Sequence, residues 1–435
     1  SNNTIRGLTI NRFESNGIQI HADAANNVIE GSFIGTDVTG SMALGNGNAG
    51  ILIGQAPDNT IGGTDPGSRN VISGNIEGIT IADAPATNNV IMGNYIGTNA
   101  TGDAAIPNNV GVLVLAPGNT IGGTAPGAGN LISGNTAQGI SLGPPNATGN
   151  LVVGNHIGVD VSGTTGLGND IGVWVDNVAD NTIGGTSEGA RNVISGNREG
   201  VTLWEAGATG NLIQGNYVGT NATGDAAIPN EIGIPVYSPG NTIGGAEVGA
   251  GNLISGNTSN GVNFYGENAT ANVVEGNLIG TDGTGTFAIG NGDSGVAIHN
   301  GASDNTIGGT EEGARNILSG NTFGLLVGDF AATGNRIRGN YIGTNATGDA
   351  AVPNAQTGIL VWGQNTVIGG SEDGAGNVIS GNLFAGIDLG PGSTGSTIQG
   401  NYIGTDATGS TVLGNELGVW ANFSPANTIG GTEPG

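Results

Sequence analysis

The apolar residues of this chain come in short alternating runs that are separated by Gly, Asn and Ser. The segment NTIRGLTINRFESNGIQIHADAAN, near the start, shows the pattern, with apolar positions at Ile5, Leu8, Ile10, Ile18 and Ile20. Alternation over a few residues predicts strands, and the residues between the runs predict tight turns. Stretches with a helical period are missing. Each such segment, with two or three short strands, therefore predicts one coil of a parallel β-helix.

The motif N-x-[IV]-x-G repeats from end to end of the chain, which is the signature of a solenoid. Its first residue falls, at steps of 24 to 33 residues, at Asn3, Asn27, Asn59, Asn89, Asn119, Asn150, Asn181, Asn211, Asn241, Asn272, Asn305, Asn335, Asn365, Ser396 and Asn427. We expect one continuous all-β domain over residues 1–435, with about 14 coils. Because the sequence starts and stops inside its repeat, we also expect an excised or processed portion of something longer.

Inserted loops make most coils longer than the first one. Odd-numbered coils carry the loop after the first strand, as in GGTAPGAGN, and even-numbered coils carry it after the second strand, as in GNYIGTNATGDAAIPN. In the odd-numbered coils SRN or ARN (at Arg69, Arg191 and Arg315) alternates with AGN. The repeating block is therefore four coils, 122–124 residues long.

Equivalent residues of successive coils are expected to stack, because paired strands lie about 4.8 Å apart. The third motif position is nearly always Ile or Val, which predicts an interior apolar column. The first position is nearly always Asn, which predicts a ladder of side-chain amides along the axis. A second Asn predicts another turn, because Asn tolerates left-handed backbone; it stands in the GN pairs at Asn94, Asn155, Asn216, Asn277, Asn340 and Asn401.

The sequence NTIGGT..GARNVISGN followed by GNYIGTNATG resembles the parallel β-helix repeats of large bacterial surface and secreted proteins. The resemblance covers essentially the whole chain and implies the right-handed β-helix of the pectin-lyase-like superfamily. Parallel crossovers are right-handed in nearly all proteins, which agrees. The motifs are specific for architecture only, since the same helix carries lyases, hydrolases, adhesins and spikes.

Charge restricts the possible partners. The chain has 34 acidic residues against 8 arginines, a formal net charge of −26. Such a body should repel nucleic acid and anionic lipid, which need cationic partners. It has no Cys, hence no disulfide or thiolate chemistry. No apolar run approaches the roughly 20 residues of a membrane span, so we expect no direct membrane insertion.

The acidic residues give little sign of catalysis. Asp103, Asp225 and Asp349 recur four coils apart, or about 19 Å, whereas the carboxylates of glycosidases lie roughly 5 to 9.5 Å apart. The resemblance implies that an enzyme of this fold would need clustered acids, often with calcium and an Arg or His. The strongest catalytic candidates are residues that depart from the repeat. They are Arg336 and Arg338, together with Glu311 and Glu312 in the preceding coil. Surface ion pairing is the alternative reading.

Three further kinds of site are open. The GT[DN]x[TS]G loops offer the carboxylate, amide and backbone oxygens that calcium prefers. The alternative is that each loop closes as an Asx turn. The candidate calcium ligands are Asp37, Asp160, Asp282 and Asp406. Glycosylation sequons begin at Asn99, Asn146, Asn221, Asn257, Asn268 and Asn345. The position after GN in even-numbered coils is mostly aromatic, at Phe33, Tyr95, Tyr217, Tyr341 and Tyr402. These rings form either an exposed row that stacks on sugars or a layer covered by the loops.

These observations favour an extracellular or cell-surface structural protein, either part of an adhesin or stalk or a subunit that stacks end to end with itself. Uniform repetition and the acidic surface support this hypothesis. A lyase or glycoside hydrolase is the alternative enzyme, and a carbohydrate-binding β-helix is the alternative binding module. The expected partners are other copies of the repeat and glycans. No cofactor is expected, although calcium binding is possible.

Overall fold

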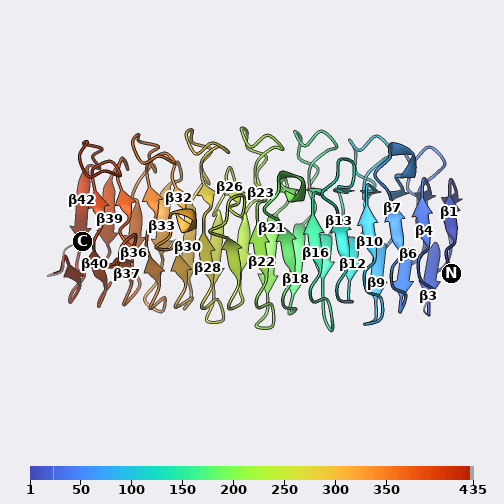
Figure 1. Ribbon diagram of the computed structural model, residues 1–435, viewed down its shortest axis with the longest axis horizontal. Coiled ribbons are helices and arrows are strands. Elements are labelled where there is room, and N and C mark those ends of the chain that lie inside the picture. Colours follow the sequence, from blue (N-terminus) through green and yellow to red (C-terminus); the bar gives the residue numbers. More distant parts are fainter. Residues whose placement is uncertain (23, 432–435) are drawn as a thin grey trace. The chain divides into compact units, whose positions relative to one another are not determined.

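The computed structural model describes residues 1–22 and 24–431 and confirms the all-β parallel solenoid of about 14 turns. The chain forms two compact units, an N-terminal unit (Ser1–Asn216) and a C-terminal unit (Tyr217–Gly435). In each unit every complete coil contributes one short strand to each of three parallel sheets, as the rows of short arrows in Figure 1 show. Whether the chain is one continuous domain stays a prediction.

The three sheets of the N-terminal unit follow the order of the coils. Its first sheet is β1 (Thr4–Arg6), β4 (Val28–Glu30), β7 (Thr60–Gly62), β10 (Val90–Met92), β13 (Thr120–Gly122), β16 (Leu151–Val153), β19 (Thr182–Gly184) and β22 (Leu212–Gln214). Its second sheet is β2 (Thr9–Ile10), β5 (Phe33–Ile34), β8 (Val71–Ile72), β11 (Tyr95–Ile96), β14 (Leu131–Ile132), β17 (His156–Ile157) and β20 (Val193–Ile194). Its third sheet is β3 (Ile18–His21), β6 (Ala49–Gly54), β9 (Glu77–Ala82), β12 (Val110–Val114), β15 (Gln138–Leu142), β18 (Ile171–Asp176) and β21 (Glu199–Trp204).

The C-terminal unit repeats this arrangement. Its first sheet is β25 (Thr242–Gly244), β28 (Val273–Glu275), β31 (Thr306–Ile307), β34 (Arg336–Ile337), β37 (Val367–Gly369), β40 (Thr397–Gln399) and β43 (Thr428–Ile429). Its second sheet is β23 (Tyr217–Val218), β26 (Leu253–Ile254), β29 (Leu278–Ile279), β32 (Ile317–Leu318), β35 (Tyr341–Ile342), β38 (Val378–Ile379) and β41 (Tyr402–Ile403). Its third sheet is β24 (Ile234–Val236), β27 (Val262–Tyr265), β30 (Ser294–His299), β33 (Phe323–Val327), β36 (Ile359–Val361), β39 (Ala385–Leu389) and β42 (Leu417–Ala421).

The core consists of apolar columns along the interior. Ile61, Ile91 and Ile121 are in register in successive coils and are fully buried. Each of these side chains covers the next, so every coil buries apolar surface. Each Å² of apolar surface removed from water stabilises the fold by roughly 25 cal/mol. The predicted Ile/Val column is therefore present.

Asparagine ladders run beside these columns. The Oδ1 atom of Asn89 accepts hydrogen bonds from the backbone N–H and the Nδ2 atom of Asn59, at 2.9 and 3.0 Å. The Nδ2 atom of Asn89 in turn donates to Asn119. The GN asparagines join a second ladder, in which Asn70 donates to Asn94. A third ladder, which the sequence did not reveal to us, begins at Asn46 and Asn75.

One predicted ladder position is wrong. Val367 pairs with Arg336 and Ile368 with Ile337, so the ladder position of that coil is Thr366 and not Asn365. The Thr366 N–H donates to the Ser396 hydroxyl at 3.2 Å. Asn365 lies one residue earlier, with a φ of 51°, and donates to the Thr333 hydroxyl. The coil contains one extra residue in the turn, which shifts the motif by one.

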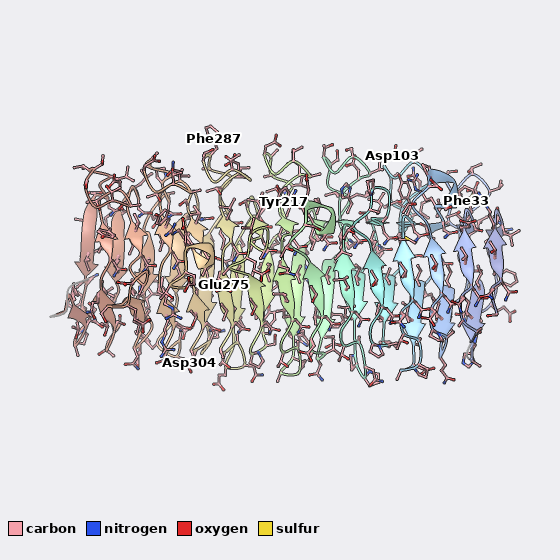
Figure 2. All side chains as sticks on the ribbon, viewed as in Figure 1. Phe33, Asp103, Tyr217, Glu275, Phe287 and Asp304 are labelled. Atoms are coloured by element: carbon pink, nitrogen blue, oxygen red, sulfur yellow. The ribbon has the colours of Figure 1, made fainter. Side chains whose placement is uncertain are left out.

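The inserted loops also have a regular structure. In even-numbered coils each loop closes on itself, as in the antiparallel bridge between Thr98 and Ala105, and Figure 2 shows Asp103 in such a projecting loop. Loops two coils apart bond to one another, since Ala100 N donates to Gly40 O at 2.9 Å. In the described part of the chain, three odd-numbered coils contain a short 3-10 helix, at η1 (Pro66–Ser68), η2 (Glu188–Ala190) and η3 (Glu312–Ala314).

Candidate functional site

All four tryptophans of the chain lie in, or directly after, strands of the third sheets. Trp174 and Trp204 lie in β18 and β21 of the N-terminal unit, while Trp420 lies in β42 and Trp362 directly follows β36 in the C-terminal unit. Successive strand residues point to opposite faces, and the inward positions of these strands hold Val and Ile. In each unit these large rings therefore point to the outer surface of a repeat that otherwise has few aromatic residues.

In the C-terminal unit this surface contains a cavity of about 360 Å³ with aromatic walls, which we call the aromatic groove. Phe384 and Trp420 meet edge to face, with ring centroids 5.3 Å apart. Trp362 is 41 % exposed and Trp420 is 39 % exposed, so both rings remain accessible. Polar groups join the rings in the lining, at Gln356, Thr357, Asp388 and Asn422. Apolar walls with a few polar groups are typical of ligand sites.

Asp388 is the polar centre of the groove. In the third sheet it is in register with Leu360 on one side and with Trp420 on the other. Burial among these side chains raises the pKa of the Asp388 carboxyl. Its Oδ1 atom is buried and has no hydrogen-bond partner among the described residues. A buried acceptor without a partner costs free energy, which marks Asp388 as unusual in this fold.

A second cavity of about 280 Å³ adjoins the groove, between Phe330, Trp362 and Pro391. The segment Gly390–Gly392 gives these rings their room. A Cβ atom at Gly390 would collide with the indole of Trp362, and one at Gly392 with the ring of Phe330. Gly392 also has a φ of 87°, which favours glycine. The sequence GPG therefore fixes where both rings lie.

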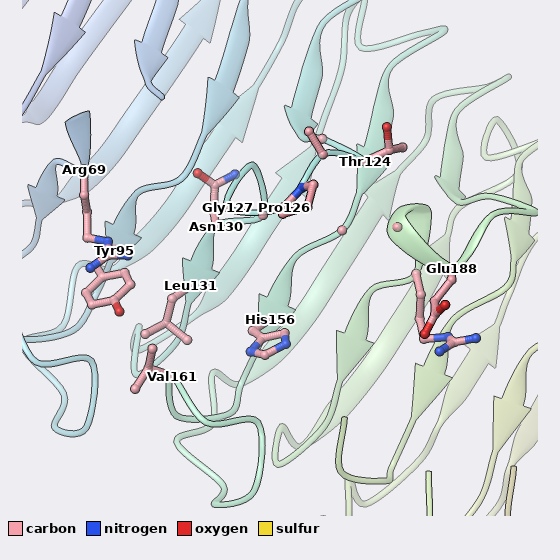
Figure 3. A pocket seen from close by; sticks show the side chains of 16 residues that line it. Arg69, Tyr95, Thr124, Pro126, Gly127, Asn130, Leu131, His156, Val161 and Glu188 are labelled. Atoms are coloured by element: carbon pink, nitrogen blue, oxygen red, sulfur yellow. The ribbon is translucent and has the colours of Figure 1, made fainter. Parts of the chain in front are cut away.

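The predicted tyrosine row has a different environment from this groove. Tyr95 is only 7 % exposed and packs with Val71 and Leu131 under its own loop. The guanidinium of Arg69 lies over the Tyr95 ring, 4.1 Å from its centroid, and Figure 3 shows the two side by side. Tyr95 therefore belongs to a covered layer and not to an exposed sugar-stacking row.

The other tyrosines differ in exposure. Arg315 covers Tyr341 with the same 4.1 Å geometry. Tyr341 and Tyr217 are half-buried, whereas Tyr402 is 49 % exposed. Sequence reasoning missed the role of the arginines, although Arg69 and Arg315 each precede their tyrosine by the same 26 residues.

The candidate Arg336 and Arg338 flank the buried Ile337 as expected, with Arg336 exposed and Arg338 half-buried. The Nη1 atom of Arg338 lies 3.8 Å from Glu372 Oε2. Glu311 precedes η3 and Glu312 begins it, and both are exposed. Within the described residues, neither of these two acids forms an ion pair with either arginine.

The loop aspartates close their own loops. The Asp37 carboxylate accepts the Thr39 hydroxyl and the backbone N–H groups of Ser41 and Met42. Equivalent bonds reach Asp160, Asp282 and Asp406. The hydroxyl of Thr39 first, then the N–H groups, lower the pKa of Asp37. No group of three or more potential metal ligands of the types His, Cys, Asp and Glu occurs in residues 1–22 and 24–431. Calcium binding stays a prediction.

The sequon asparagines fall into two environments. Asn146 and Asn268 are exposed in turns, while Asn99, Asn221 and Asn345 each donate to an aspartate of their own loop. Asn257 is 1 % exposed and its Nδ2 atom donates to Asn291 in the third ladder. A glycan on Asn257 would have to break this bond, so the exposed turns suit modification better.

Comparison with known proteins bears on the fold alone. Neither a protein-family model nor a curated protein matches the chain. No helix in the described part of the chain has the length and apolarity needed to cross a membrane.

Solved structures similar to the chain include three proteins from different settings. The A-module of the Azotobacter vinelandii mannuronan C-5 epimerase AlgE4 has 17 % identity and a TM-score of 0.43, covering 93 % of this chain and 91 % of that one. The periplasmic alginate epimerase AlgG has 13 % identity and a TM-score of 0.43, over 87 % and 76 %. PfbA, a surface adhesin of Streptococcus pneumoniae, has 11 % identity and a TM-score of 0.32, over 87 % and 83 %. The three parallel sheets of the chain itself confirm the predicted parallel β-helix fold.

Proposed function

We propose that this chain is an extracellular or cell-surface adhesive protein that binds glycans through the aromatic groove of its C-terminal unit. The observation that carries the proposal is the pair of accessible rings, Trp362 and Trp420, beside Asp388, whose Oδ1 atom has no hydrogen-bond partner among the described residues. Exposed apolar patches with a polar rim often mark binding surfaces. The regular ladders and columns on either side supply a rigid support for it.

The chemistry of the groove suits a sugar. One face of a pyranose ring presents C–H groups that pack on an indole, while its hydroxyl groups need hydrogen-bond partners. Trp362 and Trp420 offer the flat faces. Gln356, Asn422 and Asp388 offer donors and acceptors at the side. A cavity of about 360 Å³ falls within the range of roughly 300–1,000 Å³ for small-ligand sites.

The charges of the groove favour a neutral glycan. The described residues that line the groove and the adjoining cavity include Asp388 and Asp329 but no Arg or His. A uronate or sulfate group would meet two carboxyls without a counter-ion, and like charges at close quarters cost several kcal/mol. Neutral hexoses and N-acetylhexosamines avoid this cost.

A glycan array followed by calorimetry of the best ligand tests the proposal. We expect Trp362→Ala to weaken binding at least tenfold, or about 1.4 kcal/mol, because the variant removes a stacking face. Trp204→Ala is the matched control, since Trp204 is a similarly exposed tryptophan in the third sheet of the other unit. If no glycan binds, or if both variants lose affinity equally, the groove is not the site.

The enzyme hypothesis needs a separate measurement. A glycosidase uses two carboxyl groups that flank the scissile bond, and the groove itself is lined by one, Asp388. We therefore propose binding without cleavage. Incubation of the bound glycan with the protein, followed by assays for reducing ends and unsaturated products, checks this. Product formation that disappears in Asp388→Asn would favour the enzyme instead.

A further inference from the structure

The N-terminal unit contains a larger cavity, about 540 Å³, that the groove does not explain. It lies beside the second sheet and is lined by Arg69, Tyr95, His156, Glu188 and Arg191 among others. Figure 3 shows Arg69 stacked on Tyr95 at one side of this cavity and Glu188 at the other, with His156 between them. Two of the chain's 8 basic residues thus line one cavity in a protein with 34 acids.

The alternation of ARN and AGN creates this space. Gly129 takes the place that arginine takes in the loops of Arg69 and Arg191. A Cβ atom at Gly129 would collide with the carbonyl oxygen of Gly154. The intervening loop therefore cannot carry a side chain here, and the room between the two arginine loops stays open. The cavity follows from the repeat and not from loose packing.

In the part of the chain that the structure describes, the guanidinium of Arg69 is held by an aromatic ring and not by an acidic residue. Among the described residues Arg69 forms no ion pair, and its buried Nε–H group donates no hydrogen bond. Its stacking on Tyr95, at 4.1 Å, holds the planar group in place. A fixed guanidinium presents two parallel N–H groups that match the two oxygens of a carboxylate or sulfate. Such a group in an acidic protein is prepared for an external anion.

We propose that this cavity binds an acidic saccharide, with the carboxylate of a uronic acid or a sulfate ester held by Arg69. Both groups offer the same pair of oxygens to the guanidinium. The cavity is much larger than a bare oxyanion needs, and Pro126, Val161 and His156 provide walls for a sugar ring. Glu188 is exposed at the cavity, which disfavours multiply charged ligands and selects a single negative group.

The state of His156 agrees with this arrangement. Burial lowers the pKa of the His156 imidazole, against the opposing effect of the Asp160 carboxylate. At neutral pH the ring is therefore uncharged and offers one donor and one acceptor nitrogen to sugar hydroxyls. The charge on the ligand is left to the arginines.

Calorimetry at low ionic strength tests the site with four probes: galacturonate, N-acetylglucosamine 6-sulfate, galactose and inorganic sulfate. We expect at least one of the two charged sugars to bind and galactose not to bind. Arg69→Gln should weaken binding at least tenfold. Arg6→Gln is the charge-matched control, because Arg6 is exposed and only loosely paired with Glu30 at 3.5 Å, and it should bind as the wild type does.

Several outcomes would overturn the proposal. These are no binding of either charged sugar, equal losses in both variants, or binding of inorganic sulfate as tight as that of the sulfated sugar. If Arg69→Gln does not fold, Arg69→Lys replaces it, since lysine keeps the charge but lacks the planar pair of donors. Undiminished affinity in a folded Arg69→Lys variant would likewise refute recognition by the guanidinium.

Discussion

The indole of Trp362 lies where a side chain on Gly390, one coil further along, would have to stand. The Gly390 N–H donates to Val361 O at 2.9 Å, which holds the two segments together. Because it has no side chain, Gly390 leaves the space in which the indole ring of Trp362 lies. Because the ring borders both the aromatic groove and the adjoining cavity, this single contact positions the surface that we propose for glycan binding.

Gly390→Ala should displace Trp362 without unfolding the coil. The added methyl group forces the indole to rotate outward, so we expect glycan affinity to fall about tenfold, or roughly 1.4 kcal/mol, and the tryptophan emission to shift to longer wavelength. Gly67→Ala is the control, because Gly67 is exposed and no heavy atom lies within 4 Å of its added Cβ position. Unchanged tryptophan emission in Gly390→Ala would contradict the role of Gly390 in positioning the Trp362 ring.

Asp388 should make stability depend on pH. Burial raises its pKa above the ordinary value of 3.8, so the folded state binds the proton more tightly than the unfolded state does. Stability from this group is present below pH 3.8 and is lost as pH rises through the higher folded pKa. Asp388→Asn removes the titration, and we expect its melting temperature to exceed that of the wild type at pH 7 but not near pH 3. A constant difference between the two proteins at every pH would show that the titration of Asp388 plays no part.

The fold could be predicted because its determinants recur in every coil. A column of Ile and Val and a column of Asn need only the repeat length to be placed, and neighbours such as Ile61 and Ile91 fix one another in register. The prediction failed at Asn365, where NTVIGG fits the motif in two registers. The structure selects the register that buries Ile368, and Thr366 then enters the ladder.

The candidate site was harder to predict because it departs from the repeat. Trp362 follows its strand and Trp420 lies within its strand, so no shared motif links them. The available signal was that three of the four tryptophans lie in the third strand of their coils and that Trp362 directly follows its own. The tyrosine row drew attention because it recurs, yet the recurrence at Tyr95 reflects packing under Arg69 and the loop. The carboxyl of Asp388 could not be found from sequence, since its neighbours come from other coils.

Breaking a ladder should cost more than losing one exposed amide. In Asn89→Ala, the buried N–H of Asn59 loses its acceptor. The Nδ2 group of Asn59 and the Oδ1 atom of Asn119 each lose one of their partners. Buried groups left without partners cost about 1–3 kcal/mol each, so we expect a loss of about 3 kcal/mol in the free energy of unfolding. Asn146→Ala, in an exposed turn, should change it by less than about 0.5 kcal/mol. Denaturant unfolding followed by circular dichroism measures both, and equal losses would argue against the ladder as a source of stability.

The loop aspartates should make the stability of the folded state depend on pH in the opposite direction to Asp388. Burial alone would raise the pKa of Asp282, but the N–H groups of Phe287 and Thr286 and the hydroxyl of Thr284 outweigh it and lower the pKa below 3.8. The stability from this group is therefore present above pH 3.8 and is lost as pH falls through the folded pKa. Asp282→Ala should lower the melting temperature at pH 7, and this difference should shrink toward pH 2.

Asp282→Asn separates the charge of this residue from its geometry. Asn99, at the same place in another loop, accepts the N–H groups of Asp103 and Ala104 with its amide oxygen. Asn at residue 282 should therefore keep most of the stability at pH 7 while removing its decline in acid. Melting curves of both variants from pH 2 to 8, with and without calcium chloride, check this. A large calcium-dependent rise in the wild type that both variants lose would show that Asp282 is a metal ligand and not only the closing residue of its turn.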